Sequence, residues 1–397
     1  MRNKEIYHKL MLMLFLCIFL SLSGCSNQDS ASVRKHEMEQ WLEAANLSDA
    51  LTKEELYEAA LLEDTLVIYS VSSRAFEVKE SFEREYPGLT VEIKDVRGED
   101  IVNMLQDNYE KENYACDLVI CSDCNGSLNR ELLEPGILYP YIPWDIVPMM
   151  KKGHADKELV FAGEALMFFY NESVFDDKPI QNIWELTEEK YKGKIIMANP
   201  LSSFSTYGFC SAVLGEPERI AKAYEEYAGK ALDVPEGKTA GEVFWEQAAK
   251  NIVFTNSSDE VLEGIGGVGS DDYWIGIMIS SKMRYQELGY HFSPIYRLNP
   301  FSTVYTPNSV TIAAGSPNVN TAKLFVRYLL GETDGTGEGI KPFMTMGTWS
   351  ARVDVPDANE VPLSEISYLE INKEYLYKNK DYMSDFWNGL IKENVTP

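Results

Sequence analysis

Positive charge is scarce in this sequence. Its 397 residues include 36 lysines and arginines against 62 aspartates and glutamates, a formal net charge of −26 at pH 7. Nucleic acids and anionic membrane surfaces attract proteins of the opposite sign. We therefore expect neither as a partner.

Histidine and cysteine, the usual ligands of transition metals, are also rare, with four and six residues respectively. Cys121 and Cys124 have the two-residue gap that is typical of zinc and redox sites. No second C-x-x-C follows, however, and Cys210 lies far away in the sequence. We expect no metal site and no cofactor, and the sequence leaves open whether any disulfide forms among Cys116, Cys121, Cys124 and Cys210.

Catalytic motifs are absent as well. The sequence has no G-x-S-x-G motif, and the glycines at 335, 337 and 339 follow a predicted helix instead of a strand, which makes a poor phosphate loop. A hydrolase that uses His154 or His291 remains an alternative, because catalytic triads assemble in space. We expect a protein that is not an enzyme.

Only the N-terminal region contains a long apolar run. Residues 10–20 are all apolar and follow Arg2, Lys4 and Lys9, the arrangement of a secretory signal. The next motif, Leu22-Ser23-Gly24-Cys25, resembles the lipobox of bacterial lipoproteins. This resemblance implies that residues 1–24 are a signal peptide, that lipid on Cys25 anchors the protein, and that the protein lies on the outer side of the cell membrane.

Residues 25–64 are expected to form a polar tether and a helical extension, in which Thr52 and Glu55 make a capping box. From residue 65, short apolar runs alternate with amphipathic segments. They predict strands at 66–70, 89–95, 117–121, 165–170, 194–198, 252–254, 274–279 and 310–313, and helices that include 76–85, 99–108, 207–214 and 319–330. This alternation is typical of an α/β protein with mostly parallel sheets.

Several of these segments, taken in order, resemble the extracellular solute-binding proteins of the ferric-iron, thiamine and aminoethylphosphonate group. They are residues 66–70, 194–200, 275–280, 308–318 and 349–354. The resemblance implies a two-lobed type II periplasmic-binding-protein fold. Each lobe would be a mostly parallel sheet covered by helices, with two crossing segments as the hinge. We expect residues 65–165 plus 290–397 in lobe 1 and residues 166–289 in lobe 2.

The same resemblance implies the function. The protein would be the substrate-binding component of an ABC importer, a monomer that captures a small molecule between its lobes and delivers it to the permease and its ATPase. Ferric iron or a thiamine-type compound is an alternative ligand. A sensor or adhesin on the same fold is an alternative of another class.

Ligands of such sheets bind beyond the carboxyl ends of the strands, and hydroxyl groups gather there in this sequence. Hydroxyls and the N–H groups at helix starts suit an oxyanion such as phosphate or phosphonate, and Arg74 or Lys282 would add charge. The predicted ligand-binding residues are Ser72, Ser73, Ser122, Asp123, Ser202, Ser203, Ser205, Thr206, Ser280 and Ser281.

Two observations bear on the ligand. Ferric-binding relatives offer adjacent tyrosines where this sequence has Ser280-Ser281-Lys282, and no Tyr-Tyr pair occurs anywhere in it. Phenolates are the hard donors of such sites, so the substitution argues against iron. Acidic residues would instead favour a cationic solute, and aromatic residues a ring. The acidic candidates are Asp123, Asp271 and Asp272, and the aromatic ones are Phe76, Tyr207, Tyr273 and Trp274.

Overall fold

A computed structural model describes residues 27–395 of the chain. The predicted signal peptide and Cys25 lie outside these residues. The chain divides into two compact units, residues 1–46 and 47–397. In the first, the described residues form helix α2 (Asn27–Ala45). No helix in the described part is long and apolar enough to cross a membrane.

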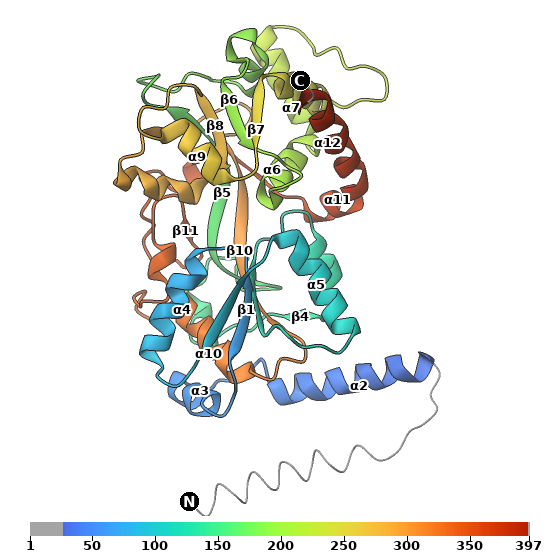
Figure 1. Cartoon of the computed structure of the whole chain (residues 1–397), viewed down its shortest axis with the longest axis vertical. Helices are drawn as coiled ribbons and strands as arrows, with labels where there is room; N and C mark the ends of the chain where they lie inside the picture. Colours follow the sequence, from blue (N-terminus) through green and yellow to red (C-terminus); the bar gives the residue numbers. More distant parts are fainter. Residues whose placement is uncertain (1–26, 396–397) are drawn as a thin grey trace, which may run out of the picture. The chain divides into compact units, whose positions relative to one another are not determined.

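One half of the second unit, here called the first lobe, is built on three parallel strands. These are β2 (Val91–Asp95), β1 (Leu66–Ser70) and β3 (Leu118–Cys121), in that order across the sheet. Helices α4 (Arg74–Glu85), α5 (Gly98–Glu110) and α10 (Val319–Leu330) belong to the same half (Figure 1). Strand β1 and helix α10 have the predicted bounds, because their apolar patterns are unbroken between clear stops.

The other half, the second lobe, repeats this plan. Strands β8 (Ile275–Ile279), β6 (Ile195–Ala198) and β7 (Ile252–Thr255) pair in parallel. Four helices accompany them: α6 (Phe204–Leu214), α7 (Pro217–Ala228), α8 (Ala240–Ala248) and α9 (Ser258–Gly266). Between α7 and α8 a turn-rich loop interrupts the helical stretch 217–250 before Thr239 caps α8.

Two long strands run through both halves. Strand β5 (Leu159–Asn171) pairs with β10 (Thr303–Ala313) in the antiparallel sense, and β5 continues onto β8 while β10 continues onto β3. A strand rises about 3.3 Å per residue, so β5 spans about 40 Å. The two-lobed α/β fold with two crossing segments is thus confirmed. Both crossing strands begin several residues before the predicted bounds.

The remaining elements are short, apart from the C-terminal helices. They comprise α3 (Lys53–Ala60), β4 (Leu138–Tyr139), β9 (Phe292–Pro294), β11 (Trp349–Ser350) and β12 (Tyr368–Glu370), together with short π- and 3₁₀-helical segments such as η1 (Leu128–Leu133) and η6 (Ser280–Leu288). The predicted capping box of Thr52 and Glu55 starts α3 and is confirmed.

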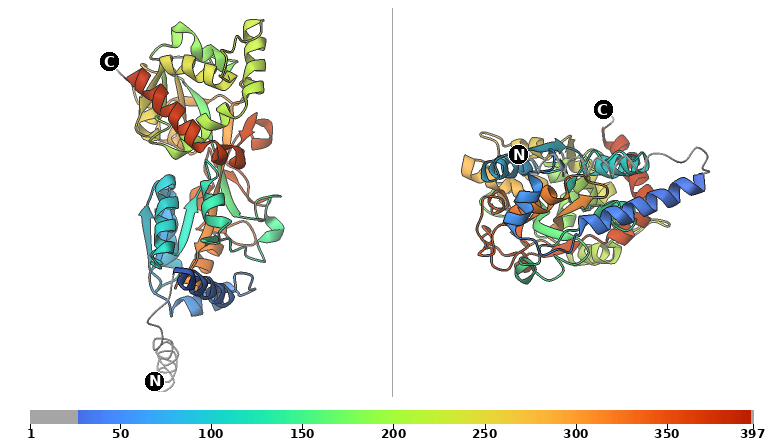
Figure 2. Two further views of the ribbon diagram at one scale, coloured as in Figure 1. Left: turned by 90° about the vertical axis from the view of Figure 1, so that its right-hand side faces the viewer. Right: turned by 90° about the horizontal axis from the view of Figure 1, so that it is seen from below.

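The C-terminal helices α11 (Lys373–Lys378) and α12 (Lys380–Val395) join the two lobes. Trp387 packs on Trp245 with 5.3 Å between ring centroids, within the apolar cluster of the second lobe. On the polar side, Lys380 Nζ is 2.8 Å from Glu131 of the first lobe. Figure 2 shows these helices (red) along the half that holds β6–β8. The predicted lobe boundaries stay a prediction. They assign residues 373–395 to lobe 1, whereas Trp387 of this segment packs in the apolar cluster of the second lobe.

Candidate functional site

A cleft of about 420 Å³ lies between the lobes of the second unit. Its floor includes Glu164 of β5 and Asn308 of β10. The first lobe contributes residues after the carboxyl ends of β1 and β3, and the second lobe contributes residues after β6, β7 and β8. This is where a sheet of this kind places its ligand, because the loops that follow parallel strands meet at one edge.

Four helices begin at this cleft. Ser73 before α4, Gly98 of α5, Phe204 of α6 and Ser258 of α9 all line it. The first N–H groups of a helix have no partner inside the helix, and the helix dipole places partial positive charge there. Four such ends around one cavity favour an anion.

Seven of the ten predicted ligand-binding residues line this cleft. They are Ser72, Ser73, Ser122, Ser202, Ser203, Ser205 and Ser281. Some hydroxyls are already engaged, since Ser202 donates to the Asn199 carbonyl at 3.1 Å and Ser203 accepts from the Thr206 hydroxyl at 2.9 Å. The loops after the strands therefore gather the hydroxyl groups as expected.

Three predicted residues do not line it. Asp123 is buried, and its carboxylate accepts hydrogen bonds from the backbone N–H groups of Gly126, Leu128 and Asn129 at 2.8, 3.3 and 3.2 Å. Burial raises the pKa of Asp123, an effect that nearby Lys373 reduces without reversing. Asp123 therefore shapes the loop and does not face the ligand.

Thr206 and Ser280 are the other two, and both are fully buried. The Ser280 hydroxyl donates to the Gly347 carbonyl and accepts from the Ala165 N–H at 2.9 Å, which ties η6 to β5. Thr206 lies inside the first turn of α6. Neighbouring residues in a turn face different sides, so strand-end position alone does not decide which side chain reaches the cleft.

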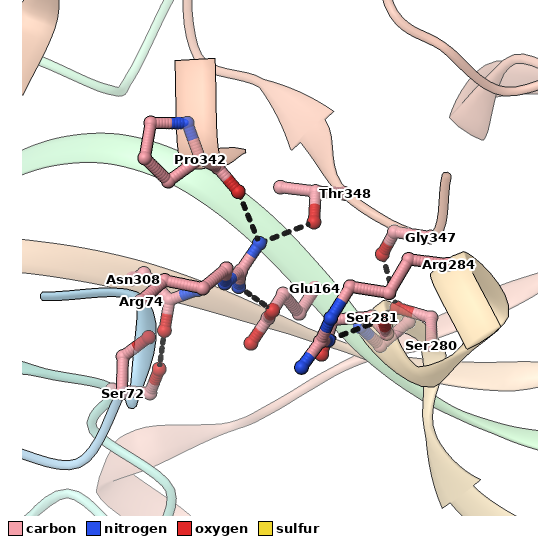
Figure 3. Close-up of polar contacts among 12 residues, drawn as sticks. Ser72, Arg74, Glu164, Ser280, Ser281, Arg284, Asn308, Pro342, Gly347 and Thr348 are labelled. Carbon is pink, nitrogen blue, oxygen red and sulfur yellow. Dashed lines mark hydrogen bonds and ion pairs between the residues drawn. The ribbon is translucent and has the colours of Figure 1, made fainter. Parts of the chain in front are cut away.

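Arg74 and Glu164 form an ion pair on the floor of the cleft (Figure 3). Arg74 also donates to the Thr348 hydroxyl at 2.8 Å, and its guanidinium lies 4.3 Å from the Phe343 ring centroid. Burial lowers the pKa of Arg74, Glu164 opposes that shift, and the positive charge of Arg284 adds to it. The guanidinium of Arg74 is thus fixed by its ion pair with Glu164 and its hydrogen bond to Thr348. Arg284 lines the same cleft.

Arg284, from η6, is the less constrained of the two arginines. Its Nη1 donates to the Ser281 carbonyl at 2.6 Å, the one hydrogen bond that its guanidinium makes within residues 27–395. Figure 3 shows this guanidinium on the opposite side of Glu164 from Arg74. Lys282, by contrast, is paired with Asp259. The guanidinium of Arg284 therefore has donors to offer a bound anion.

Asn308 adds a directed donor. Its side chain is 5% exposed, and its Oδ1 accepts from the Ser122 hydroxyl. Its Nδ2 is buried and has no hydrogen-bond partner among the described residues. A buried amide without a partner costs free energy, so its position at the cleft points to a ligand acceptor.

Glu164, Arg284 and Asn308 were missed in the sequence. Glu164 is the single charge inside the otherwise apolar run 159–169, and Asn308 interrupts β10. A polar residue within a buried strand was the available signal. Arg284 lies five residues after the end of β8, outside any buried strand, so no sequence pattern marked it as a binding residue.

The four aromatic candidates do not line the cleft. Tyr207 borders a neighbouring cavity, Tyr273 and Trp274 pack against the apolar clusters, and Phe76 is exposed outside the lining. Phe204 is the aromatic residue that lines it instead. Asp271 and Asp272 are also outside it.

Metal donors are not assembled here. No tyrosine lines the cleft, and residues 27–395 contain no group of three or more histidine, cysteine, aspartate or glutamate side chains placed to hold a metal. The cysteines Cys116, Cys121, Cys124 and Cys210 are free and buried. Burial raises the pKa of Cys121 to about 12, which leaves it a neutral thiol.

Comparison with known proteins agrees with this geometry. Residues 77–365 match the family model described as bacterial extracellular solute-binding protein. Among curated proteins, none matches the sequence significantly.

Solved structures resemble the fold at low sequence identity. The periplasmic binding protein AfuA from Actinobacillus pleuropneumoniae, with exogenous fructose-6-phosphate bound, has a TM-score of 0.62 at 18% identity, over 83% of this chain and 99% of that chain. The apo ferric-ion-binding protein A of Pasteurella haemolytica has 0.61 at 14%, over 84% and 100%. Iron-bound HitA from Pseudomonas aeruginosa has 0.61 at 13%, over 82% and 99%. At these identities the likeness shows the fold alone.

Proposed function

Since the chain belongs to the family of bacterial extracellular solute-binding proteins, we propose that its cleft captures a small solute through a phosphate or phosphonate group. The protein is the substrate-binding component of an ABC importer. What we propose is the ligand class, the residues that hold it, and binding without catalysis.

The observation that carries this proposal is the convergence of donors on one cavity. Four helix starts, the hydroxyls of Ser73, Ser203 and Ser281, and the guanidinium of Arg284 all border the same cleft. Each phosphate oxygen accepts two or three hydrogen bonds, and charged donors make the stronger ones. AfuA, whose structure holds fructose-6-phosphate, supports a phosphate-bearing solute on this fold.

Ferric iron is the less favoured ligand. Ferric-binding proteins occur among the structural neighbours, but this cleft offers serine hydroxyls and only Asp95, Glu164 and Asp259 as carboxylates. Glu164 and Asp259 are each committed to an ion pair. Hard trivalent iron requires several free anionic oxygens.

A ligand panel tests the proposed class. Inorganic phosphate, sugar phosphates, alkylphosphonates, thiamine and ferric citrate are compared by calorimetry and thermal unfolding. A true ligand at 100 times its dissociation constant adds about 2.7 kcal/mol of stability. We expect the phosphate- or phosphonate-bearing compounds to stabilise the protein.

Ser281→Ala should then weaken binding of the phosphate compound, because the hydroxyl would bind a charged group worth about 1.5–3 kcal/mol. Ser173→Ala, an exposed serine outside the cleft, is the matched control. Tight binding of ferric ion that survives Ser281→Ala, with no response to any phosphorus compound, would refute the proposed class.

We further propose that lipid on Cys25 anchors the protein outside the membrane. The support is the motif Leu22–Cys25 after an apolar run. Cys25→Ser is expected to leave the unprocessed precursor, without fatty-acid labelling, in radiolabelled cells. Cleavage and labelling equal to the wild type would contradict the anchor, and Cys17→Ser, inside the signal, is the control.

A further inference from the structure

A second cavity, of about 480 Å³, adjoins the cleft. Both cavities are lined by Arg97, Ser202, Ser203 and Phe204. Apart from Ser202, Ser203 and Tyr207, its lining residues were not among the predicted ligand-binding candidates, and of its side chains the anion site proposed above uses only the Ser203 hydroxyl. Its size suits a small organic ligand.

Three parts of the fold wall this cavity. The first lobe contributes Glu99 and Asn103 of α5 with Glu131 of η1, and the second lobe contributes the start of α6. The C-terminal helix α12 closes it with Lys380, Asp381, Ser384 and Asn388. Its walls are held together by the Lys380–Glu131 ion pair and by the Tyr207 hydroxyl, which donates to the Lys380 carbonyl at 3.1 Å.

Phe204, which packs against Gly98, borders both cavities. A side chain at Gly98 would place its Cβ 2.4 Å from Phe204 Cδ1, so this contact requires glycine. Ser203 and Arg97 border both spaces beside the ring. A ligand group bound in the cleft beside these residues therefore lies next to the second cavity.

The cationic side chains that line the second cavity are each paired with a carboxylate. Lys380 pairs with Glu131, and Arg97 Nε lies 3.0 Å from Asp100. Hydrogen bonding to Glu131 raises the pKa of Lys380, so this pair stays charged and mutually satisfied at neutral pH.

Two carboxylates of the lining, Glu99 and Asp381, remain outside these pairs, and the other groups left for a ligand are neutral and polar. Asn103, Asn125 and Asn388 supply amides, Ser127 and Ser384 supply hydroxyls, and Tyr207 supplies an aromatic ring. Asn388 Nδ2 donates to the Ser384 carbonyl at 2.9 Å, which leaves its Oδ1 as an acceptor. Amides and hydroxyls both donate and accept, which matches the alternating donors and acceptors of a polyol.

We propose that this second cavity binds a neutral polyhydroxylated group, such as the sugar part of a phosphorylated sugar whose anion lies in the cleft. The cavities adjoin and share four border residues, which favours one solute with two ends over two separate molecules. A free sugar has the same chemistry and is the other source. The two-ended form rests on the proposed function, whereas the polyol site itself does not.

Asn388→Trp tests it by filling the cavity from the exposed side of α12, where a large side chain leaves the apolar face of the helix intact. Glu393→Trp, exposed on the same helix and outside the lining, is the matched control. Calorimetry compares fructose-6-phosphate, inorganic phosphate and free fructose.

We expect Asn388→Trp to weaken fructose-6-phosphate at least tenfold and to leave inorganic phosphate within about twofold, with Glu393→Trp changing neither. Weakening of free fructose alone, in a protein that does not bind phosphate, would keep the polyol site and refute the phosphate class. If Asn388→Trp leaves both fructose compounds unchanged, or if neither compound binds the wild type more tightly than inorganic phosphate does, the inference is wrong.

Discussion

Replacing Arg284 with methionine is expected to weaken binding of a phosphate-bearing solute by roughly ten- to a hundredfold, the equivalent of about 1.5–3 kcal/mol for a charge-assisted hydrogen bond. Arg284 borders the cleft and makes one hydrogen bond, to the Ser281 carbonyl. Methionine keeps an unbranched apolar stem and removes the guanidinium with its charge. Because Arg284 holds no buried partner charge, folding stability without ligand should change by less than about 1 kcal/mol.

Arg297→Met separates this local effect from a change in net charge. Arg297 is exposed and lies outside the cleft lining, and the substitution removes the same unit of positive charge. Titration calorimetry of both variants with the same probe decides the question. An equal loss of affinity in both variants would attribute the effect to the overall field of the protein instead of to direct contact.

Arg74→Met is expected to destabilise the folded protein by about 3–5 kcal/mol, since it leaves a carboxylate uncompensated in a nearly buried place. Glu164 would lose the one ion-pair partner that it has within residues 27–395, and the Thr348 hydroxyl and the Pro342 carbonyl would lose a donor. Urea unfolding without ligand measures the change. The exposed pair of Lys111 and Asp107 gives a matched control, because Lys111→Met should cost less than about 1 kcal/mol.

The second substitution Glu164→Gln should recover a large part of this loss. It removes the charge that Arg74→Met strands, while the shape of the site is kept. Double-mutant analysis then yields the coupling between the two residues. Additive free-energy changes would show that Arg74 acts through packing on Phe343 and Thr348 and not through Glu164.

The secondary structure was predictable wherever the local pattern was strong. Strand β1 and helix α10 match their predicted bounds, since each is an apolar pattern between evident stops. The crossing strands were predicted too short. The residues that the prediction left out include Gly163, Glu164 and Asn308. These residues interrupt the run of apolar side chains, although the backbone pairing of the two strands continues through them.

The binding site was predictable in composition but not in its charges. Serines after strand ends meet at the cleft because parallel strands deliver their loops to one edge. Glu164 and Asn308 reach it from the middle of the crossing strands, where the rule of strand ends does not apply. Arg284 reaches it through the turn of η6, whose path depends on packing against β5 and the segment near Gly347.

The sequence by itself determined an α/β fold with hydroxyls at its strand ends, because the periodicity and order of the segments are local properties. Its resemblance to the solute-binding proteins implied the two lobes and the binding function. Only the tertiary structure decided which of two neighbours, Ser122 or Asp123, faces the cleft, because that depends on how the following turn folds back on its own N–H groups. It alone also decided that α12 would wall a second cavity beside α5. Helices α5 and α12 are more than 250 residues apart in the sequence. They come together because Trp387 of α12 is buried in the second lobe, and no local sequence pattern predicts such a long-range contact.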